Sequence, residues 1–329
     1  MSSREESRQE KRAQALVKNS AAYETARTEL AKIYDEGPRN RLHYAIRRDL
    51  VHARHADSAG SAPSSPAAAL APLKGWALHL YLIAIFDAQS RRPAGVTVAN
   101  TRPLCSVNGT GSGWADLLPA IVVKRDGAPI TKKGLRAGMR RQAVHALNLL
   151  EREHLAAIRG APPGAPGRYN QVQFLDETGD GRRSVWSRHY SIPRISPFEP
   201  SHAIVLLPKS FFLNGWVHVL TAAEITTYLM ILDLQIRHPE AASTGVFKVA
   251  SQRVDRYGIR RDVYATHRQL AGYGLIRRLD DPNRSPDGRI LRRSSQRYVS
   301  QPYRFTVLHD GFDRPALTTV AAHLLSQPG

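Results

Sequence analysis

The chain has 329 residues, enough for two folded domains, and its hydrophobic content of 42% excludes wholesale disorder. Its formal net charge of +19 opposes compaction unless an anion offsets it, so the composition predicts a nucleic acid or an anionic membrane surface as the partner. Arginine makes up 38 of the 47 basic residues, and arginine binds phosphate and guanine bidentately. Coding bias in a GC-rich genome accounts for much of the excess of arginine over lysine, but it does not explain why the net charge is positive.

The cysteine count and the length of the apolar runs exclude further classes of protein. The single cysteine, Cys105, excludes internal disulfides and a Cys-rich zinc site. No apolar stretch follows the first residues, and the longest apolar run, residues 76–86, is too short to cross a bilayer. We therefore expect a cytoplasmic, nucleoid-associated protein with no membrane contact, and we expect no cofactor and no metal.

Residues 1–55 are expected to form a polar, basic helical arm. A thin apolar stripe from Leu16 to Tyr34 predicts one helix within the first 36 residues. A second basic segment keeps helical spacing through Leu42, Ile46 and Leu50. Such an arm docks weakly, forms a homodimer or remains mobile.

Residues 56–72 are dominated by Ala, Ser and Pro, which cannot bury a core, and they predict a linker. From residue 73 onward the same order of elements is predicted twice: a helix, a helical pair, a strand, a loop and a strand. A shift of 120 residues places Arg140 and Arg141 on Arg260 and Arg261. Chance can align arginines in so basic a chain, and the shared order of elements is the stronger argument. The expected parts are a first domain at 73–189, a structured connector at 190–220, a second domain at 221–312 and a tail at 313–329.

The second of these two repeats, residues 221–312, shows the clearer helix-capping and helix-ending residues. Thr221 and Glu224 have the spacing of a capping box at the start of an apolar helix. Gly258 stands where a short second helix needs a left-handed cap. A third helix is expected from Arg261, burying Val263, Tyr264, His267 and Leu270 until Gly272 and Gly274 end it. In the connector, Phe211, Phe212 and Trp216 are expected to pack between the two domains.

Residues 256–276, RYGIRRDVYATHRQLAGYGLI, resemble the recognition-helix region of bacterial winged helix-turn-helix proteins. The resemblance covers residues 221–308 well and residues 73–175 loosely. It implies a mainly α fold with small β-hairpins, of class α+β, with two winged-helix domains in tandem. The phrase LPKSFFLNGW, residues 207–216, is mildly similar to the lead-in of the winged-helix domain in plasmid replication initiators.

The resemblance implies double-stranded DNA as the partner, because the N-terminal turn of such a helix meets base edges while flanking cations hold phosphates. Arg261 and Arg268 could each pair with a guanine. In the second copy the candidate DNA-binding residues are Arg260, Arg261, Tyr264 and Arg268, then Arg277 and Arg278 at the base of the hairpin, and Arg284, Arg289, Arg292, Arg293 and Arg297 in its loop. In the first copy they are Lys132, Lys133, Arg136, Arg140 and Arg141, with Arg182, Arg183 and Arg188 near the hairpin. For Tyr264 and His267 a packed core position is favoured over a contact.

The sequence thus predicts a non-catalytic, sequence-specific DNA-binding protein at an operator or a replication origin. It acts either as a transcription regulator or as an initiator of a plasmid or mobile element, and any small-molecule effector is unknown. A nicking or recombination enzyme stays an alternative because His189-Tyr190 and His267 stand beside arginines, although carboxylates to complete such a site were not found. A protein-interaction scaffold is the other alternative, and for the first copy a purely structural or dimerising role stays open.

Overall fold

The computed structural model describes residues 3–53, 64–73, 75–106, 112–121, 131–159, 162, 165, 167–181, 184–194, 203–241, 243–279 and 302–326. In this part of the chain the protein is mostly helical and carries three antiparallel sheets of two strands each, which confirms the expected α+β class. None of its described helices is long and apolar enough to span a membrane.

The helices are α1 (Ser3–Lys18), α2 (Ser20–Glu36), α3 (Pro66–Leu70), α4 (Ala77–Arg91), α5 (Lys132–Arg152), α6 (Lys209–Leu213), α7 (Trp216–Val219), α8 (Ala222–Arg237), α9 (Ala250–Tyr257), α10 (Arg261–Tyr264), α11 (His267–Gly272) and α12 (Ala316–Ser326). The strands are β1 (His43–Arg47), β2 (Ala156–Arg159), β3 (Gln171–Phe174), β4 (Ile204–Pro208), β5 (Ile276–Leu279) and β6 (Arg304–Val307). Among the 3-10 turns are η2 (Trp114–Leu117), η4 (Trp186–Arg188) and η7 (His309–Asp313).

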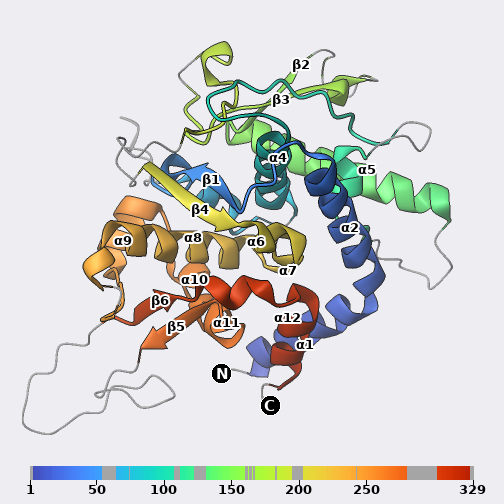
Figure 1. Ribbon diagram of the computed structural model, residues 1–329. Helices are drawn as coiled ribbons and strands as arrows, with labels where there is room; N and C mark the ends of the chain where they lie inside the picture. Colours follow the sequence, from blue (N-terminus) through green and yellow to red (C-terminus); the bar gives the residue numbers. More distant parts are fainter. Residues whose placement is uncertain are drawn as a thin grey trace, which may run out of the picture.

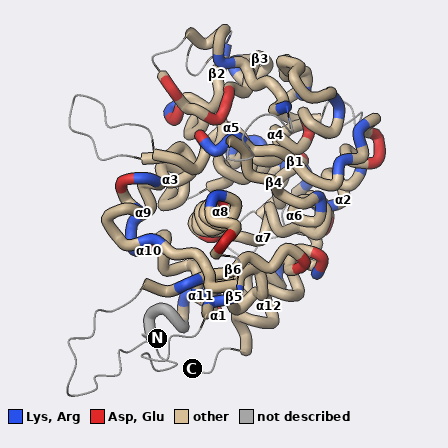
Figure 2. The backbone as a smooth tube through the Cα atoms, turned by 60° about the vertical axis from the view of Figure 1, so that its left-hand side comes forward, with Lys and Arg blue, Asp and Glu red and all other residues tan. Residues whose placement is uncertain are grey.

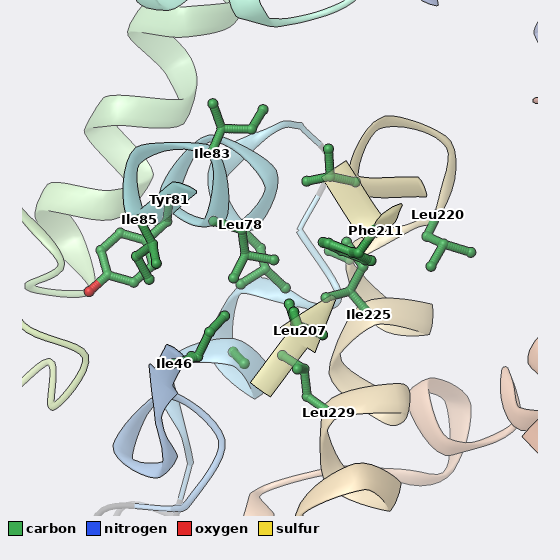
Figure 3. Close-up of a cluster of buried hydrophobic side chains, with 14 of the residues drawn as sticks. Ile46, Leu78, Tyr81, Ile83, Ile85, Leu207, Phe211, Leu220, Ile225 and Leu229 are labelled. Carbon is green, nitrogen blue, oxygen red and sulfur yellow. The ribbon is translucent and has the colours of Figure 1, made fainter. Parts of the chain in front are cut away.

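The centre of the molecule is the β1–β4 sheet with α4 and α8 packed around it (Figures 1 and 3). Both helices are apolar on nearly every side and are buried along almost their whole length, as all-round apolar helices are. Leu78, Leu207 and Leu229, from α4, β4 and α8, converge in one cluster (Figure 3). This core joins parts of the chain that lie more than 100 residues apart.

The second basic helix expected in the arm is replaced by β1. Ile46 is buried, whereas Leu42 remains 64% exposed, so the helical stripe does not form. β1 pairs with β4, and the Gln89 side chain bonds both backbone groups of Ala45, at 3.0 Å to the amide and 2.6 Å to the carbonyl. The strand forms because distant partners satisfy its backbone on both sides.

The arm is docked, which was the first of the three alternatives that the sequence left open. The chain breaks at Asn19, whose side chain bonds the Ala15 carbonyl at 2.7 Å, so that two helices form where one was expected. α1 lies along α12, which forms within the segment expected as a tail, and α2 packs against α6 and η2 (Figure 1). Leu16 and Leu30 are fully enclosed by these contacts.

The described half of the expected linker is also packed. Ser65 caps α3 by accepting from the Ala68 amide and donates to the Tyr257 carbonyl at 2.9 Å. Ala67 and Leu70 are buried where α3 meets α4 and α8. The small side chains of α3 cannot form a core by themselves, but they allow this helix to pack closely against the core formed by α4 and α8. Residues 56–63 lie outside the described residues.

Two groups of elements repeat one order. The first unit contains α4, η2, α5, β2 and β3, and the second contains α8, α9, α10, α11, β5 and β6. Between the first two helices of the second unit, Val246 bridges to Phe305 of β6, which adds a third strand position beside the hairpin. Thr97, which follows α4, bridges instead to Ser191, which lies beyond β3 in a segment whose His189 bridges to Leu175 at the end of the hairpin. In the first unit the described residues between α4 and α5 contain the turn η2 at the place of the expected second helix.

The connector contacts both units, as the sequence predicted. Phe212 stacks on Phe86 of α4 with ring centroids 4.6 Å apart. Phe211 and Trp216 pack on Phe312 beside the second unit, at 5.3 Å and 5.6 Å. All three connector rings are buried.

Candidate nucleic-acid interface

The turn before α10 has the conformation that the sequence predicted. Gly258 ends α9 with φ of +68°, in the left-handed region that glycine adopts without strain. Ile259 is buried behind it. The Arg253 guanidinium donates to the Ile259 carbonyl at 3.1 Å and stacks 4.0 Å from the Tyr264 ring centre. The turn and the helix after it are therefore tied to α9.

The helix expected from Arg261 is interrupted after one turn. The Thr266 hydroxyl donates to the Val263 carbonyl at 2.7 Å, and the Thr227 hydroxyl of α8 reaches the same carbonyl at 2.9 Å. These bonds take an acceptor that a continuous helix would use, so α10 and α11 are separate. The outward positions are unaffected: Arg260, Arg261 and Arg268 are exposed. Figure 2 places the basic positions of α10, α11 and β5 beside one another at the lower left.

His267 and Tyr264 occupy the inner side, as favoured from the sequence. His267 is 3% exposed and packs against the rings of Tyr264, Tyr303 and Phe305. Burial, followed by the positive charges of Arg268, Arg278 and Arg253, lowers its pKa to about 3. The imidazole is neutral, and the charges around it are cationic.

The hairpin continues the same surface. Arg277 is exposed on β5, and Arg278 is half-buried with its guanidinium 5.0 Å from the Tyr303 ring centre. The five candidates in the hairpin loop, Arg284, Arg289, Arg292, Arg293 and Arg297, lie outside the described residues. We name the set Arg260, Arg261, Arg268, Arg277 and Arg278 the α11 patch.

A second cationic set lies on α5. Thr131 caps this helix, and Ala143, Leu147 and Leu150 bury its inner face. All five candidates from the first copy are exposed, and three of them repeat every four residues on one side. We name the set Lys132, Lys133, Arg136, Arg140 and Arg141 the α5 patch.

Arg188, which was expected beside this set, is instead 1% exposed. Its guanidinium donates to the His154 carbonyl and lies 4.0 Å from Asp176. It is a structural residue that ties η4 to the end of α5, so its prediction as a basic contact was wrong. Arg182 and Arg183 lie outside the described residues.

Several other arginines of the protein are paired with carboxylates, unlike the members of the two patches. Arg12, Arg47 and Arg48 are bound to buried carboxylates at 2.6 Å, 2.7 Å and 2.5 Å. No member of either patch forms an ion pair within the described part of the chain. The members of both patches are therefore unpaired among the described residues; the α11 patch spreads over α10, α11 and β5, and the α5 patch lies on one helix.

Sequence reasoning missed two contacts near these surfaces. Arg253 supports Tyr264 from beneath, as described above. In the first unit Trp186 is 72% exposed, and the Arg159 guanidinium lies 3.8 Å from its ring centre. A tryptophan inside the basic run RRSVWSRH, residues 182–189, was an available signal for the second contact.

Groups that suggested an enzyme do not form an exposed nucleophilic site. Tyr190 is 3% exposed and accepts a hydrogen bond from the Gln89 amide at 2.9 Å. Burial, together with Glu177, raises the pKa of its hydroxyl. The described residues contain no group of three or more side chains placed to hold a metal ion.

Comparisons of this chain with protein-family models, with curated proteins and with solved structures give no match.

Proposed function

We propose that this protein is a non-catalytic, sequence-specific binder of double-stranded DNA, built from two winged-helix domains in tandem and acting at an operator or a replication origin. The observation that carries the proposal is the α11 patch, because it combines exposed, unpaired arginines with a helix whose opposite side is buried. A winged helix presents the exposed side of its third helix to the major groove.

The order of elements supports the winged-helix assignment. In the second unit a strand position between the first two helices bridges to β6, the returning strand of the hairpin, whereas in the first unit Thr97 bridges to Ser191, beyond the hairpin. Such a small sheet beside three helices is the arrangement of a winged helix. The first unit departs from it in that its described residues between α4 and α5 form the turn η2 and no longer helix.

Two reading units on one chain suit a site with repeated elements. Successive major-groove faces lie about 10 base pairs apart, so a protected site of at least two such faces is expected. Both an operator with repeats and an origin meet that description. An array of short repeats beside the gene and a neighbouring partition gene would favour the origin.

Arg261→Ala and Arg268→Ala are each expected to weaken binding to the specific site by about 1–3 kcal/mol, because a bidentate guanine contact is lost. A salt-titrated binding assay on genomic fragments, followed by footprinting, identifies the site and measures the loss. Arg39→Ala removes the same charge from an exposed position in the connection between α2 and β1, and it serves as the control. Equal losses for all three variants would exclude base recognition by the α11 patch.

The α5 patch is expected to act mainly through phosphates. Arg136→Ala and Arg140→Ala should weaken binding to every sequence alike. Each lost phosphate contact should also reduce the slope of log K against log salt by about 0.9. The measurement is the salt dependence with specific and random duplexes. An unchanged slope would assign α5 to structure or dimerisation instead.

The enzyme alternative has a direct test. Supercoiled plasmid incubated with the protein and Mg²⁺ is expected to remain supercoiled. Conversion to the nicked form, abolished by Tyr190→Phe while binding persists, would overturn the non-catalytic proposal.

A further inference from the structure

A cavity of about 240 Å³ opens into the first unit between α4, residues 96–101 and β3. Its inner wall consists of buried side chains, namely Tyr81, Ile85, Trp114, Phe174 and Tyr190. The mouth is formed by exposed residues, among them Arg92 and Val96. An apolar cavity of about 150 Å³ can bind benzene, whereas pockets for drug-sized ligands have volumes of about 300 Å³ or more. The cavity thus fits one or two rings.

The polar groups of the wall already have partners. The Tyr81 hydroxyl donates to the Leu175 carbonyl at 2.8 Å, and the Trp114 indole donates to Asn100 at 3.2 Å. Asp87 is bound by Arg91 at 2.5 Å and by Arg102 at 2.6 Å. The Tyr81 hydroxyl and the Trp114 indole are thus satisfied, and both arginines bind the Oδ1 atom of Asp87, so an apolar, preferably aromatic, body suits the inner wall.

The mouth has a different character. The Arg92 side chain is exposed, lines the opening and forms no ion pair within the described residues. Asp87 is the acidic residue in the lining, and two arginines already neutralise it. A guanidinium pairs best with a planar carboxylate.

We propose that this cavity binds a small aromatic carboxylate, with its ring against Tyr81, Trp114 and Phe174 and its carboxylate at Arg92. The site is separate from both cationic patches, and its occupancy does not depend on the proposed DNA function. Side chains of α4 and η2 line the cavity, and both elements also pack against α5. An effect of the ligand on DNA binding would rest on the proposed function, whereas ligand binding itself would not.

The test uses the full chain with indole-3-acetate as the probe and 3-methylindole, its neutral counterpart, as the comparison. Calorimetry and thermal unfolding should show saturable 1:1 binding of the carboxylate, at least tenfold tighter than the neutral compound. Arg92→Gln should weaken binding of the carboxylate at least tenfold and leave the neutral compound unaffected. Ala88→Leu, which fills the cavity from α4, should remove saturable binding of both compounds.

Three outcomes would overturn the proposal. Absence of saturable binding by both probes would exclude the ligand class. Unchanged binding in Ala88→Leu would place the probe elsewhere on the protein. Equal affinity for the charged and neutral compounds would exclude recognition by Arg92. If Ala88→Leu does not fold, as judged by circular dichroism, Arg92→Gln decides the question alone, since its side chain is exposed. A protein that binds the probe but not DNA would retain this site and lose the proposed function.

Discussion

Arg12→Ala is expected to lower the free energy of unfolding by about 3–5 kcal/mol, because it leaves a buried carboxylate without its cation. Glu224 is 1% exposed, and Arg12 reaches it from α1 with two bonds of 2.6 Å and 2.7 Å. Burial alone would raise the pKa of Glu224, but Arg12, the Thr221 amide and the Tyr273 hydroxyl together hold it below its usual value. Urea unfolding of the variant at pH 7.5 measures the loss.

A matched control lies in the neighbouring helix. Arg27 pairs with Glu24 at 2.7 Å and reaches the Leu213 carbonyl at 3.4 Å, but the two side chains are 39% and 51% exposed, so Arg27→Ala should lower stability by only about 0.2–1 kcal/mol. Glu224→Gln added to Arg12→Ala should recover much of the loss, since glutamine retains a capping role without a charge. A loss below about 1 kcal/mol for Arg12→Ala would mean that α1 does not dock on the second unit in solution.

Acidification from pH 7.5 to 5.5 is expected to destabilise the protein by about 4 kcal/mol through three buried histidines. Burial lowers the pKa of His79 and of His218 to about 4, and burial with three arginines lowers that of His267 to about 3. The unfolded chain binds these protons near pH 6.5, whereas the folded chain does not. Stability is therefore complete above pH 6.5 and falls as pH decreases toward the folded values, by about 1.4 kcal/mol per histidine at pH 5.5.

The geometry explains why protonation is resisted. His79 donates from Nε2 to the Leu220 carbonyl at 2.8 Å, and His218 donates from Nε2 to the Leu117 carbonyl at 2.9 Å. Each Nδ1 is buried and has no hydrogen-bond partner among the described residues, so a second proton would find no acceptor there. Both bonds join α4 or η2 of the first unit to the segment that leads into α8.

His79→Gln and His218→Gln separate this effect from other titrations. Glutamine can keep the donor but does not titrate. The free energy of unfolding that is lost between pH 7.5 and 5.5 should therefore be smaller by about 1.4 kcal/mol in each variant. His43→Gln, at an exposed position, is the control. Urea midpoints at the two pH values give the comparison, and identical pH profiles for all variants would contradict the buried, neutral assignment.

Local signals were sufficient for several elements. The capping box of Thr221 and Glu224, the left-handed cap at Gly258 and the apolar helix α8 all form as predicted. These features depend on bonds within about four residues or on one-sided hydrophobicity, both of which are written in a short stretch of chain. The inward positions of Val263, His267 and Leu270 followed from the same spacing.

Contacts between distant residues could not be predicted in this way. Arg12 and Glu224 are separated by 212 positions, and β1 is a strand only because β4 and Gln89 satisfy its backbone. Arg188 carries the same chemistry as the exposed arginines, yet it is buried because the His154 carbonyl needs a donor at that place. Residue type and periodicity thus predict many of the helices and their apolar faces, although β1 forms a strand from a segment with helical spacing. Which charge is paired, which small residue is packed and which cation faces solvent depend on neighbours that only the folded chain brings together.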